Sequence, residues 1–388
     1  MQPPLSSPEH AKRQCTAPIK ATGTEPKLRR KRQTEPATIV LARVSTTEIE
    51  VLVRLSVLDQ SPVAQGSSAS QALARTRELA QLADRLGYER YWVAEHHGSE
   101  SFAGSSPEVL ISHLAACTQR IRVGSAGVML MHYSPLKVAE NFKLLENLYP
   151  DRIDLGIGRA PGSDGITAAA LAYGNQIGIE YFPAKVADLK AFLRDETPHT
   201  PALKDVKATP RSAETPQMWM LGSSRDGAEL AARFGLPYSH AHFIAPEQAI
   251  PAIEHYRSRF TPSAFAEAPQ VNLGIFVICS DDAERARALG RCRDLWRLRV
   301  ERGEFGPYPS VEEAASVTLT PQEQARIDAR SEHQLLGTPA EVVPAIRDLA
   351  DRCGADELSV ISICHDHNDR VRCYELLAEH LLTASGAS

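Results

Sequence analysis

The chain has 388 residues, of which 43% are hydrophobic and 23% are charged, so it holds enough apolar material for one large α/β domain or two smaller ones. Its formal net charge is −5, and because residues 1–50 hold nine Lys/Arg against five Asp/Glu, the rest of the chain is acidic. This distribution argues against a nucleic-acid-binding body, and no apolar run reaches the roughly 20 residues that a membrane-spanning helix needs.

Residues 1–50 differ in composition from the rest of the chain. They are rich in proline and include a basic run at residues 27–32, which predicts a disordered N-terminal extension. A targeting segment, upstream sequence included through a misplaced start codon, and a nucleic-acid-binding tail stay open as alternatives. No apolar segment follows the basic run, which disfavours a secretory signal.

The seven cysteines are scattered and include no Cys-x-x-Cys pair. An odd number without regular spacing is typical of reduced thiols. We therefore expect a cytoplasmic protein whose cysteines are small core residues.

From residue 54 onward, short apolar runs alternate with longer segments of helical periodicity. The predicted strands are 54–59, 90–94, 121–128, 153–157, 217–221, 236–239, 271–279 and 357–363. The predicted helices are 70–86, 107–118, 135–148, 225–234, 246–260, 281–298, 338–353 and 369–383. Proline opens several of them and glycine closes others, as at Pro135 and Gly87.

Eight strands that alternate with helices predict a parallel sheet, and a closed (β/α)8 TIM barrel is the favoured form. A Rossmann fold is disfavoured because no Gly-x-Gly-x-x-Gly follows the first strand. Two segments exceed the plain repeat. Residues 195–216 predict a surface insertion before the fifth strand, and residues 299–337 predict a longer insertion, of the kind that forms lids, before the eighth.

The third strand runs into an irregular apolar segment, residues 124–132. Glycines at such a strand end let the backbone approach a bound group. Its apolar residues Val128, Met129 and Leu130 suit the flat face of a ring better than a sugar or a phosphate, and the candidate cofactor contacts are Gly127, Val128 and Met129. Together with the end of the second strand, this segment suggests a flavin enzyme.

Glu95-His96-His97 follows the second strand, at the end where a TIM barrel carries its chemistry. One of the two imidazoles could act as a base or a hydrogen-bond donor, because histidine titrates near neutral pH. The alternative is a pair of surface histidines with ordinary hydrogen bonds.

Two further strand ends carry groups that can bind an anion. Arg159 follows the fourth strand in a glycine-rich turn, and Ser223 and Ser224 precede the helix 225–234. A guanidinium and the start of a helix together favour a phosphate. A solvated arginine and simple capping by serine are the alternatives.

The histidines also allow a rival chemistry. His240 and His242 end the sixth strand and His365 and His367 follow the eighth, so with His96 and His97 they could hold a divalent metal, as in a metal-dependent barrel hydrolase. Such a hydrolase would be expected to carry His-x-His at its first strand, where this chain has residues 59–62, Asp-Gln-Ser-Pro. No metal is therefore expected.

Several separated motifs resemble those of the bacterial luciferase-like flavin-dependent monooxygenases, in particular their single-chain oxidoreductase subgroup. The motifs are Leu58-Asp-Gln-Ser-Pro62, Trp92-Val-Ala-Glu-His-His97, Gly127-Val-Met-Leu130, Tyr133-Ser-Pro-Leu-Lys-Val-Ala-Glu-Asn141, Asp154-Leu-Gly-Ile-Gly-Arg159 and Leu221-Gly-Ser-Ser224. The resemblance spans residues 54–383. The extra histidine of His240-Ala-His242 departs from it, and residues 1–50 have no counterpart.

The resemblance implies a luciferase-like TIM-barrel domain over residues 51–388, with FMN at the barrel mouth. It implies a non-proline cis peptide within residues 127–130 and phosphate contacts from Arg159, Ser223 and Ser224. It places His96 near the reaction centre as the catalytic residue. It also implies a homodimer and reduced FMN supplied by a separate NAD(P)H:flavin reductase, although a deazaflavin cofactor also occurs in the family.

The sequence thus predicts a monooxygenase in which reduced FMN and O2 form a C4a-peroxyflavin that oxidises a small organic substrate. His96 would donate or accept a proton. The candidate substrate-pocket residues are His97, His132, His240 and His242. A metal-dependent hydrolase and a non-catalytic flavin-binding protein of the same fold stay open, and neither nucleic acid nor membrane is an expected partner.

Overall fold

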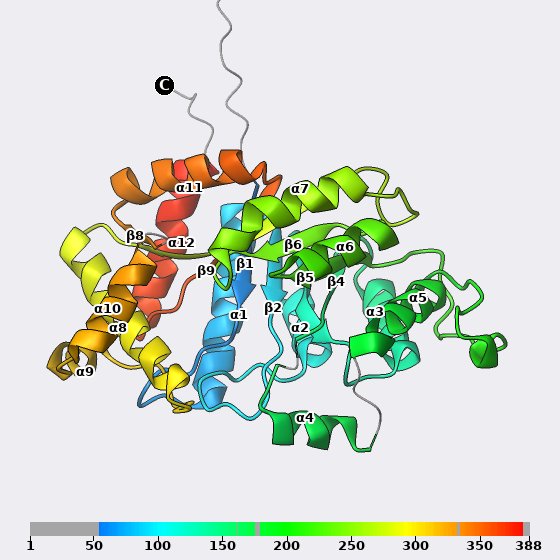
Figure 1. The fold of residues 1–388 in the computed structure, drawn as a ribbon, viewed down its shortest axis with the longest axis horizontal. Helices are drawn as coiled ribbons and strands as arrows, with labels where there is room; N and C mark the ends of the chain where they lie inside the picture. The colour runs from blue at the N-terminus through cyan, green and yellow to red at the C-terminus, as the bar shows by residue number, and fades with distance from the viewer. Residues whose placement is uncertain (1–53, 161, 175–178, 332–333, 383–388) are drawn as a thin grey trace, which may run out of the picture. The chain divides into compact units, whose positions relative to one another are not determined.

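Parallel strands close into a barrel in the computed structural model, which describes residues 54–160, 162–174, 179–331 and 334–382 (Figure 1). In ring order these strands are β1 (Arg54–Asp59), β2 (Arg90–Val93), β3 (Arg122–Met129), β4 (Ile153–Gly158), β5 (Gln217–Gly222), β6 (Tyr238–Ala241), β7 (Val271–Cys279) and β9 (Glu357–Ile361). Because β6 pairs with β7, β7 with β9 and β9 with β1, every one of them has two parallel neighbours. The predicted (β/α)8 barrel is confirmed.

Helices surround this barrel. Those that follow the strands are α1 (Ala69–Leu86), α2 (Pro107–Cys117), α3 (Pro135–Leu148), α5 (Phe182–Leu193), α6 (Arg225–Phe234), α7 (Ala249–Arg259), α8 (Ala283–Glu301), α11 (Pro339–Cys353) and α12 (His367–Leu381). Their ends follow local sequence signals. A capping box of Ser68 and Gln71 starts α1, and Gly87 ends it with a left-handed φ of 86° that favours glycine.

The core lies on both sides of the barrel wall. Every residue of β4 and β9 is buried, as expected for parallel strands that are covered by helices outside and by side chains inside. α6 packs on β5 and α7 and buries the small residues Ala228, Ala231 and Ala232. The helices can therefore approach closely.

A buried polar layer fills the barrel at the N-terminal ends of its strands. The Arg90 guanidinium donates to Glu357 at 3.1 Å and to Asp154 at 2.9 Å, and the Asn272 amide donates to Glu357 at 3.1 Å. Burial alone would lower the pKa of Arg90, but the two carboxylates raise it above its ordinary value. Because side chains fill this end of the barrel, we expect a ligand-binding cavity at the opposite end, where the strands have their C-termini.

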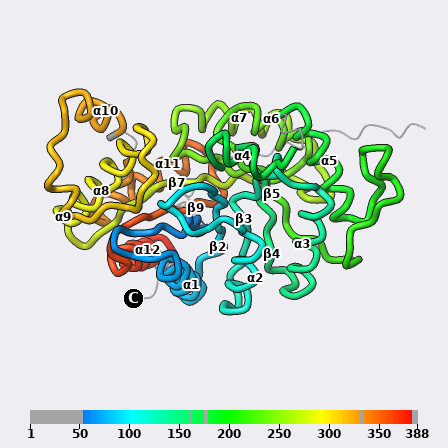
Figure 2. The backbone as a smooth tube through the Cα atoms, turned by 90° about the horizontal axis from the view of Figure 1, so that it is seen from below, coloured from blue at the N-terminus to red at the C-terminus, as the bar shows by residue number. Residues whose placement is uncertain are grey.

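Five elements were not predicted. α5 and the short α4 (Gly165–Ala172) lie between β4 and β5, and β8 (Leu335–Gly337) pairs with β7 outside the ring. In the segment 299–337, α9 (Val311–Ser316) and α10 (Pro321–Ser331) lie beside α8, on the side of the barrel away from α3 and α5 (Figure 2). The segment 195–216 contains a short 3-10 turn, Pro201–Leu203, and no other helix or strand.

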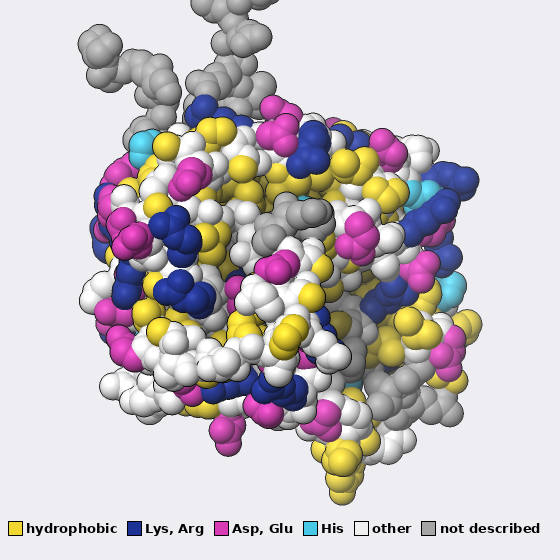
Figure 3. Space-filling view, turned by 60° about the vertical axis from the view of Figure 1, so that its left-hand side comes forward, with side chains coloured by type: hydrophobic (Ala, Val, Ile, Leu, Met, Phe, Trp, Pro, Cys, Tyr) yellow, Lys and Arg dark blue, Asp and Glu magenta, His cyan; other side chains and the backbone are white. Residues whose placement is uncertain are grey.

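The visible surface carries mixed charges. On the face that brings α8 to α10 forward, Lys/Arg and Asp/Glu side chains are interspersed (Figure 3). Within the described ranges no helix is long and apolar enough to cross a membrane. The predicted disordered extension, residues 1–50, lies outside the described residues.

Candidate active site

A cavity of about 440 Å³ opens at the C-terminal ends of the strands. Five of its lining residues are glycines, which keep its wall close to the backbone: Gly127, Gly158, Gly162, Gly222 and Gly274. A Cβ atom added to Gly158 would meet no described atom within 4 Å. This part of the wall is therefore bare backbone that faces open space.

The end of β3 forms the irregular wall of this cavity. The register between β3 and β4 shifts between Ser125 and Val128, and the peptide bond between Ala126 and Gly127 is cis. This bond lies one peptide before the predicted segment 127–130. Gly127 and Met129 line the cavity, whereas Val128 is buried in the hydrophobic core and is not part of the cavity lining.

Glu95 fixes this bulge to the end of β2. The side chain is 1% exposed, and its two oxygens accept hydrogen bonds from the Met129 amide at 3.0 Å and the Tyr133 hydroxyl at 2.7 Å. The His97 Nε2 atom lies 2.8 Å from the same carboxylate. Sequence reasoning noted Glu95 only as part of a motif and missed this role, because two of its partners are more than 30 residues away along the chain.

His96 lines the cavity as a neutral imidazole. Its ring packs on Phe102 with centroids 4.5 Å apart, and its buried Nδ1 atom has no hydrogen-bond partner among the described residues. Burial, and then the neighbouring His97, lower the pKa of His96 to about 4. At neutral pH the ring can therefore accept a proton or donate a hydrogen bond through its N–H, but it is not an imidazolium.

Arg159, Ser223 and Ser224 meet at one end of the cavity. The Arg159 Nη2 atom donates to the Ser224 hydroxyl at 3.3 Å, and it lies 3.9 Å from the exposed carboxylate of Asp226. Ser224 occupies the N-cap position of α6, but its side chain makes no capping bond within the described chain. A guanidinium, two hydroxyls and a helix start therefore converge where a phosphate could bind.

The structure separates the four candidate substrate-pocket histidines. His97 lines a neighbouring cavity of about 330 Å³ together with His96. His132 is buried and is not part of the lining of the 440 Å³ cavity. His240 is also buried, its Nε2–H donating to the Ala245 carbonyl at 3.2 Å and its Nδ1 accepting from the Tyr238 hydroxyl at 3.0 Å. His242 lines a different cavity, of about 340 Å³.

The model of the family described as luciferase-like monooxygenase matches residues 53–357 of the chain. The chain belongs to the luciferase-like monooxygenase family. The family resemblance inferred from the motifs is confirmed, and it identifies the protein as an oxidoreductase of the monooxygenase class.

Relatives that this chain covers almost completely agree with this assignment. The chain is 44% identical over 329 residues to YwcH of Bacillus subtilis, covering 84% of this chain and 99% of that protein. It is 33% identical over 335 residues to the N-acetyl-S-alkylcysteine monooxygenase of Bacillus subtilis, covering 86% and 99% of the two chains. The crystal structure of apo-MsnO8 is similar with a TM-score of 0.80 and 40% identity, over 86% of this chain and 99% of that one.

The candidate metal ligands of the hydrolase alternative do not converge among the described residues. Among the described residues of this luciferase-like monooxygenase, no group of three or more His, Cys, Asp or Glu side chains could hold a metal ion. The candidate ligands have other contacts or lie elsewhere. His97 pairs with Glu95, and His240 is hydrogen-bonded to Tyr238 and Ala245. His242 lines a different cavity.

Proposed function

We propose that the protein binds reduced FMN in the 440 Å³ cavity and uses O2 to oxygenate a small organic substrate. One observation carries this proposal: an apolar, glycine-lined cavity leads directly to the group formed by Arg159, Ser223 and Ser224. A flat ring and a phosphate joined by a flexible chain need these two environments side by side. When bound, reduced FMN supplies two electrons and activates O2 at its C4a position. One oxygen atom enters the substrate and the other leaves as water.

The protein's own residues would position the cofactor and manage protons. The backbone at Gly127 and Met129 would support one face of the ring, held in place by Glu95 through the Met129 amide. His96 would accept a proton at its free Nδ1 atom or donate a hydrogen bond there in the other tautomer. The apolar lining would exclude water from the reacting atoms.

The named activity of a relative indicates which substrates to test first. A relative with 33% identity is an N-acetyl-S-alkylcysteine monooxygenase, and a thioether sulfur is a good acceptor for one oxygen atom. Small thioethers are therefore the first compounds to screen for the protein.

We also infer a homodimer and a separate NAD(P)H:flavin reductase as partners in a cytoplasmic setting. Exposed apolar side chains on α2 and α3 support the dimer: Val109 is 69% exposed, Leu144 is 52% exposed and Leu148 is 56% exposed. The six described cysteines are free thiols, which agrees with a reducing compartment. Sedimentation with and without FMN would test the dimer.

The proposal predicts incorporation of oxygen from O2 into a substrate. Full-length protein, reduced FMN, 18O2 and a panel of small thioethers would be combined, and the products analysed by mass spectrometry. We expect one 18O atom in a product that forms only with the protein. Saturable FMN binding without any labelled product, and without flavin oxidation that responds to any compound, would instead indicate a flavin-binding protein.

A further inference from the structure

A second chamber adjoins the cofactor cavity at the barrel mouth. It has a volume of about 240 Å³ and shares Gln60, Phe243 and Ile244 with the cofactor cavity. The rest of its lining is largely apolar: Phe276, Trp296, Val300, Tyr308, Ile361 and Ile363. Three charged residues of α8 interrupt this apolar lining: Arg293, Arg297 and Glu301.

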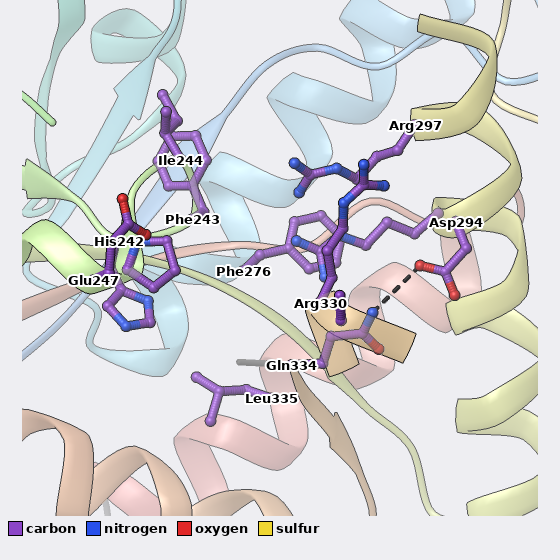
Figure 4. A pocket seen from close by; sticks show the side chains of 13 residues that line it. His242, Phe243, Ile244, Glu247, Phe276, Asp294, Arg297, Arg330, Gln334 and Leu335 are labelled. Atoms are coloured by element: carbon purple, nitrogen blue, oxygen red, sulfur yellow. Dashed lines mark hydrogen bonds between the residues drawn. The ribbon is translucent and has the colours of Figure 1, made fainter. Parts of the chain in front are cut away.

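The same two arginines also line the outer cavity of about 340 Å³ that contains His242. Figure 4 shows Arg297 and Arg330 gathered near the ring of Phe276, with Phe243 and Ile244 across the cavity. Because they line both cavities, Arg293 and Arg297 lie at the boundary between the apolar chamber and the outer cavity. A molecule that lies in the chamber would reach them beside the outer cavity.

Arg293 and Arg297 differ from the other arginines of the barrel in their contacts with described residues. Within the described residues neither makes an ion pair or a hydrogen bond, and the Arg293 guanidinium instead lies over the Phe276 ring, 3.7 Å from its centroid. Arg293 and Arg297 are half-buried, whereas the fully buried Arg90 pairs with two carboxylates and the fully buried Arg370 pairs with Asp59 at 2.6 Å. A half-buried guanidinium without an ion pair is free to bind an anionic ligand.

The nearby carboxylates are engaged elsewhere or exposed. Asp294 accepts a hydrogen bond from Gln334 at 3.3 Å, and Glu301 pairs with Arg326 and Arg330. Glu247 lies at the exposed edge of the outer cavity. Burial, followed by the repulsion of Arg297, lowers the pKa of Arg293 to about 10, which still leaves it charged at neutral pH. Asp294 acts electrostatically on both arginines and Glu301 acts on Arg297, but neither carboxylate makes an ion pair with them. Among the described residues, the arginine pair therefore has no direct carboxylate partner.

We propose that Arg293 and Arg297 bind a carboxylate of the substrate, whose apolar body lies in the 240 Å³ chamber with its other end beside the cofactor cavity. The identification of the ligand as substrate rests on the proposed function. Two forked guanidinium donors suit a carboxylate, and the aromatic and aliphatic lining suits a short apolar body. The substrate class is thus an organic acid, oxygenated at a position away from its carboxylate.

On the face that brings α8 to α10 forward, acidic and basic side chains are interspersed (Figure 3). A large polyanion would find no continuous basic surface on this face, whereas a small anion could enter the cavity and meet the two arginines.

Binding to the flavin-free, full-length protein tests this proposal. 4-Phenylbutyrate, hexanoate and N-acetyl-S-benzylcysteine would each be compared with the matching amide by calorimetric titration, with inorganic phosphate as a separate arm. We expect at least one acid to bind about tenfold or more tightly than its amide. Arg297→Gln and Arg293→Gln should remove this preference, and Arg297→Lys should keep part of it.

A matched control is available just beyond the end of α8. Arg302 forms an ion pair with Glu323 and lines neither cavity, so Arg302→Gln should keep the wild-type preference. Thermal unfolding would show that each variant is folded, and Arg297→Gln carries the test if Arg293→Gln is not. The proposal is overturned if no acid binds better than its amide, if Arg297→Gln keeps the preference, or if phosphate binding that Arg297→Gln abolishes is tighter than the binding of every acid.

This experiment contains no flavin, so its result is separate from that of the proposed function. Acid binding that depends on Arg297, without any FMN binding, would leave the anion site standing and refute the flavin proposal. FMN binding without a preference for acids would do the opposite.

Discussion

The imidazole of His96 stays uncharged because its ring is packed against Phe102 and lies next to His97. The pKa of a free histidine is 6.5 and that of His96 is about 4, so between these pH values the unfolded chain binds a proton that the folded chain does not. The lowered pKa of His96 therefore does not change the free energy of unfolding above about pH 6.5. As the pH falls from about 6.5 toward 4, proton binding to the unfolded chain lowers the stability of the folded protein.

Replacing His96 by asparagine removes this source of pH dependence. We expect the His96→Asn variant to lose less unfolding free energy than the wild type when the pH is lowered from about 7 to about 5. Urea denaturation at both pH values measures the difference. The exposed His113 provides a control, because His113→Asn should follow the wild type. Equal pH dependence in the wild type and His96→Asn would contradict the neutral imidazole.

Glu95 is the residue on which the shape of the β3 bulge depends. Glu95→Ala would leave the Met129 amide and the Tyr133 hydroxyl without their acceptor, at a cost of about 2 kcal/mol in unfolding free energy. FMN affinity should fall as well, because the cavity wall at Met129 loses its support. Glu100→Ala, at an exposed position, should change neither quantity. Urea denaturation and FMN titration of both variants measure these effects.

At the scale of elements, the strand ends create the cavity and their glycines keep it open. Gly158→Val would place a side chain into free space at the end of β4, so the protein should remain as stable as the wild type. FMN affinity should nevertheless fall by about tenfold or more, because the side chain occupies the ligand volume. Gly165 also faces open space but lies outside the cavity, so Gly165→Val should bind FMN normally. Thermal unfolding and FMN titration would decide, and normal FMN binding by Gly158→Val would place the cofactor elsewhere.

The strands and their order could be predicted because each is a short apolar run with clear boundaries. β1 and β7 have the predicted bounds, and the helices that end at Gly87 and Gly235 end where the glycines indicated. β8 could not be found this way, since it has three residues and pairs outside the ring. α5 could have been predicted from the sequence, because the apolar residues Phe182, Val186 and Leu189 recur with helical spacing.

The candidate site could be predicted only where its functional groups belong to a short motif at the end of a strand. Arg159 and Ser224 follow two adjacent strands, so barrel topology alone places them close together. Glu95, Arg293 and Arg297 show their roles only in the folded chain. α8 carries several other arginines, and nothing in the local sequence tells which of them turn toward a cavity. The contacts of His240 could not be predicted either. It lies at the end of a strand as predicted, but both of its ring nitrogens are engaged in hydrogen bonds with Tyr238 and Ala245.

At the scale of the whole molecule, the barrel separates a stabilising end from a functional end. The buried layer at the N-terminal ends depends on Arg90, and Arg90→Met would leave Asp154 and Glu357 with a missing partner. We expect a loss of about 3–5 kcal/mol in unfolding free energy. Arg54→Met, at an exposed position of β1, should stay within about 0.5 kcal/mol of the wild type. Guanidinium denaturation monitored by circular dichroism measures both, and a loss under about 1 kcal/mol for Arg90→Met would contradict a stabilising layer.

The central claim is that the cavity at the barrel mouth holds FMN by its phosphate and its ring. Anaerobic titration of the full-length protein with reduced FMN and reduced riboflavin, in the wild type and Arg159→Ala, tests it most directly. The account predicts that the wild type binds FMN at least about tenfold more tightly than riboflavin, and that Arg159→Ala reduces FMN affinity to near that of riboflavin. Equal affinities for the two flavins in the wild type, or no saturable binding of either, would contradict it.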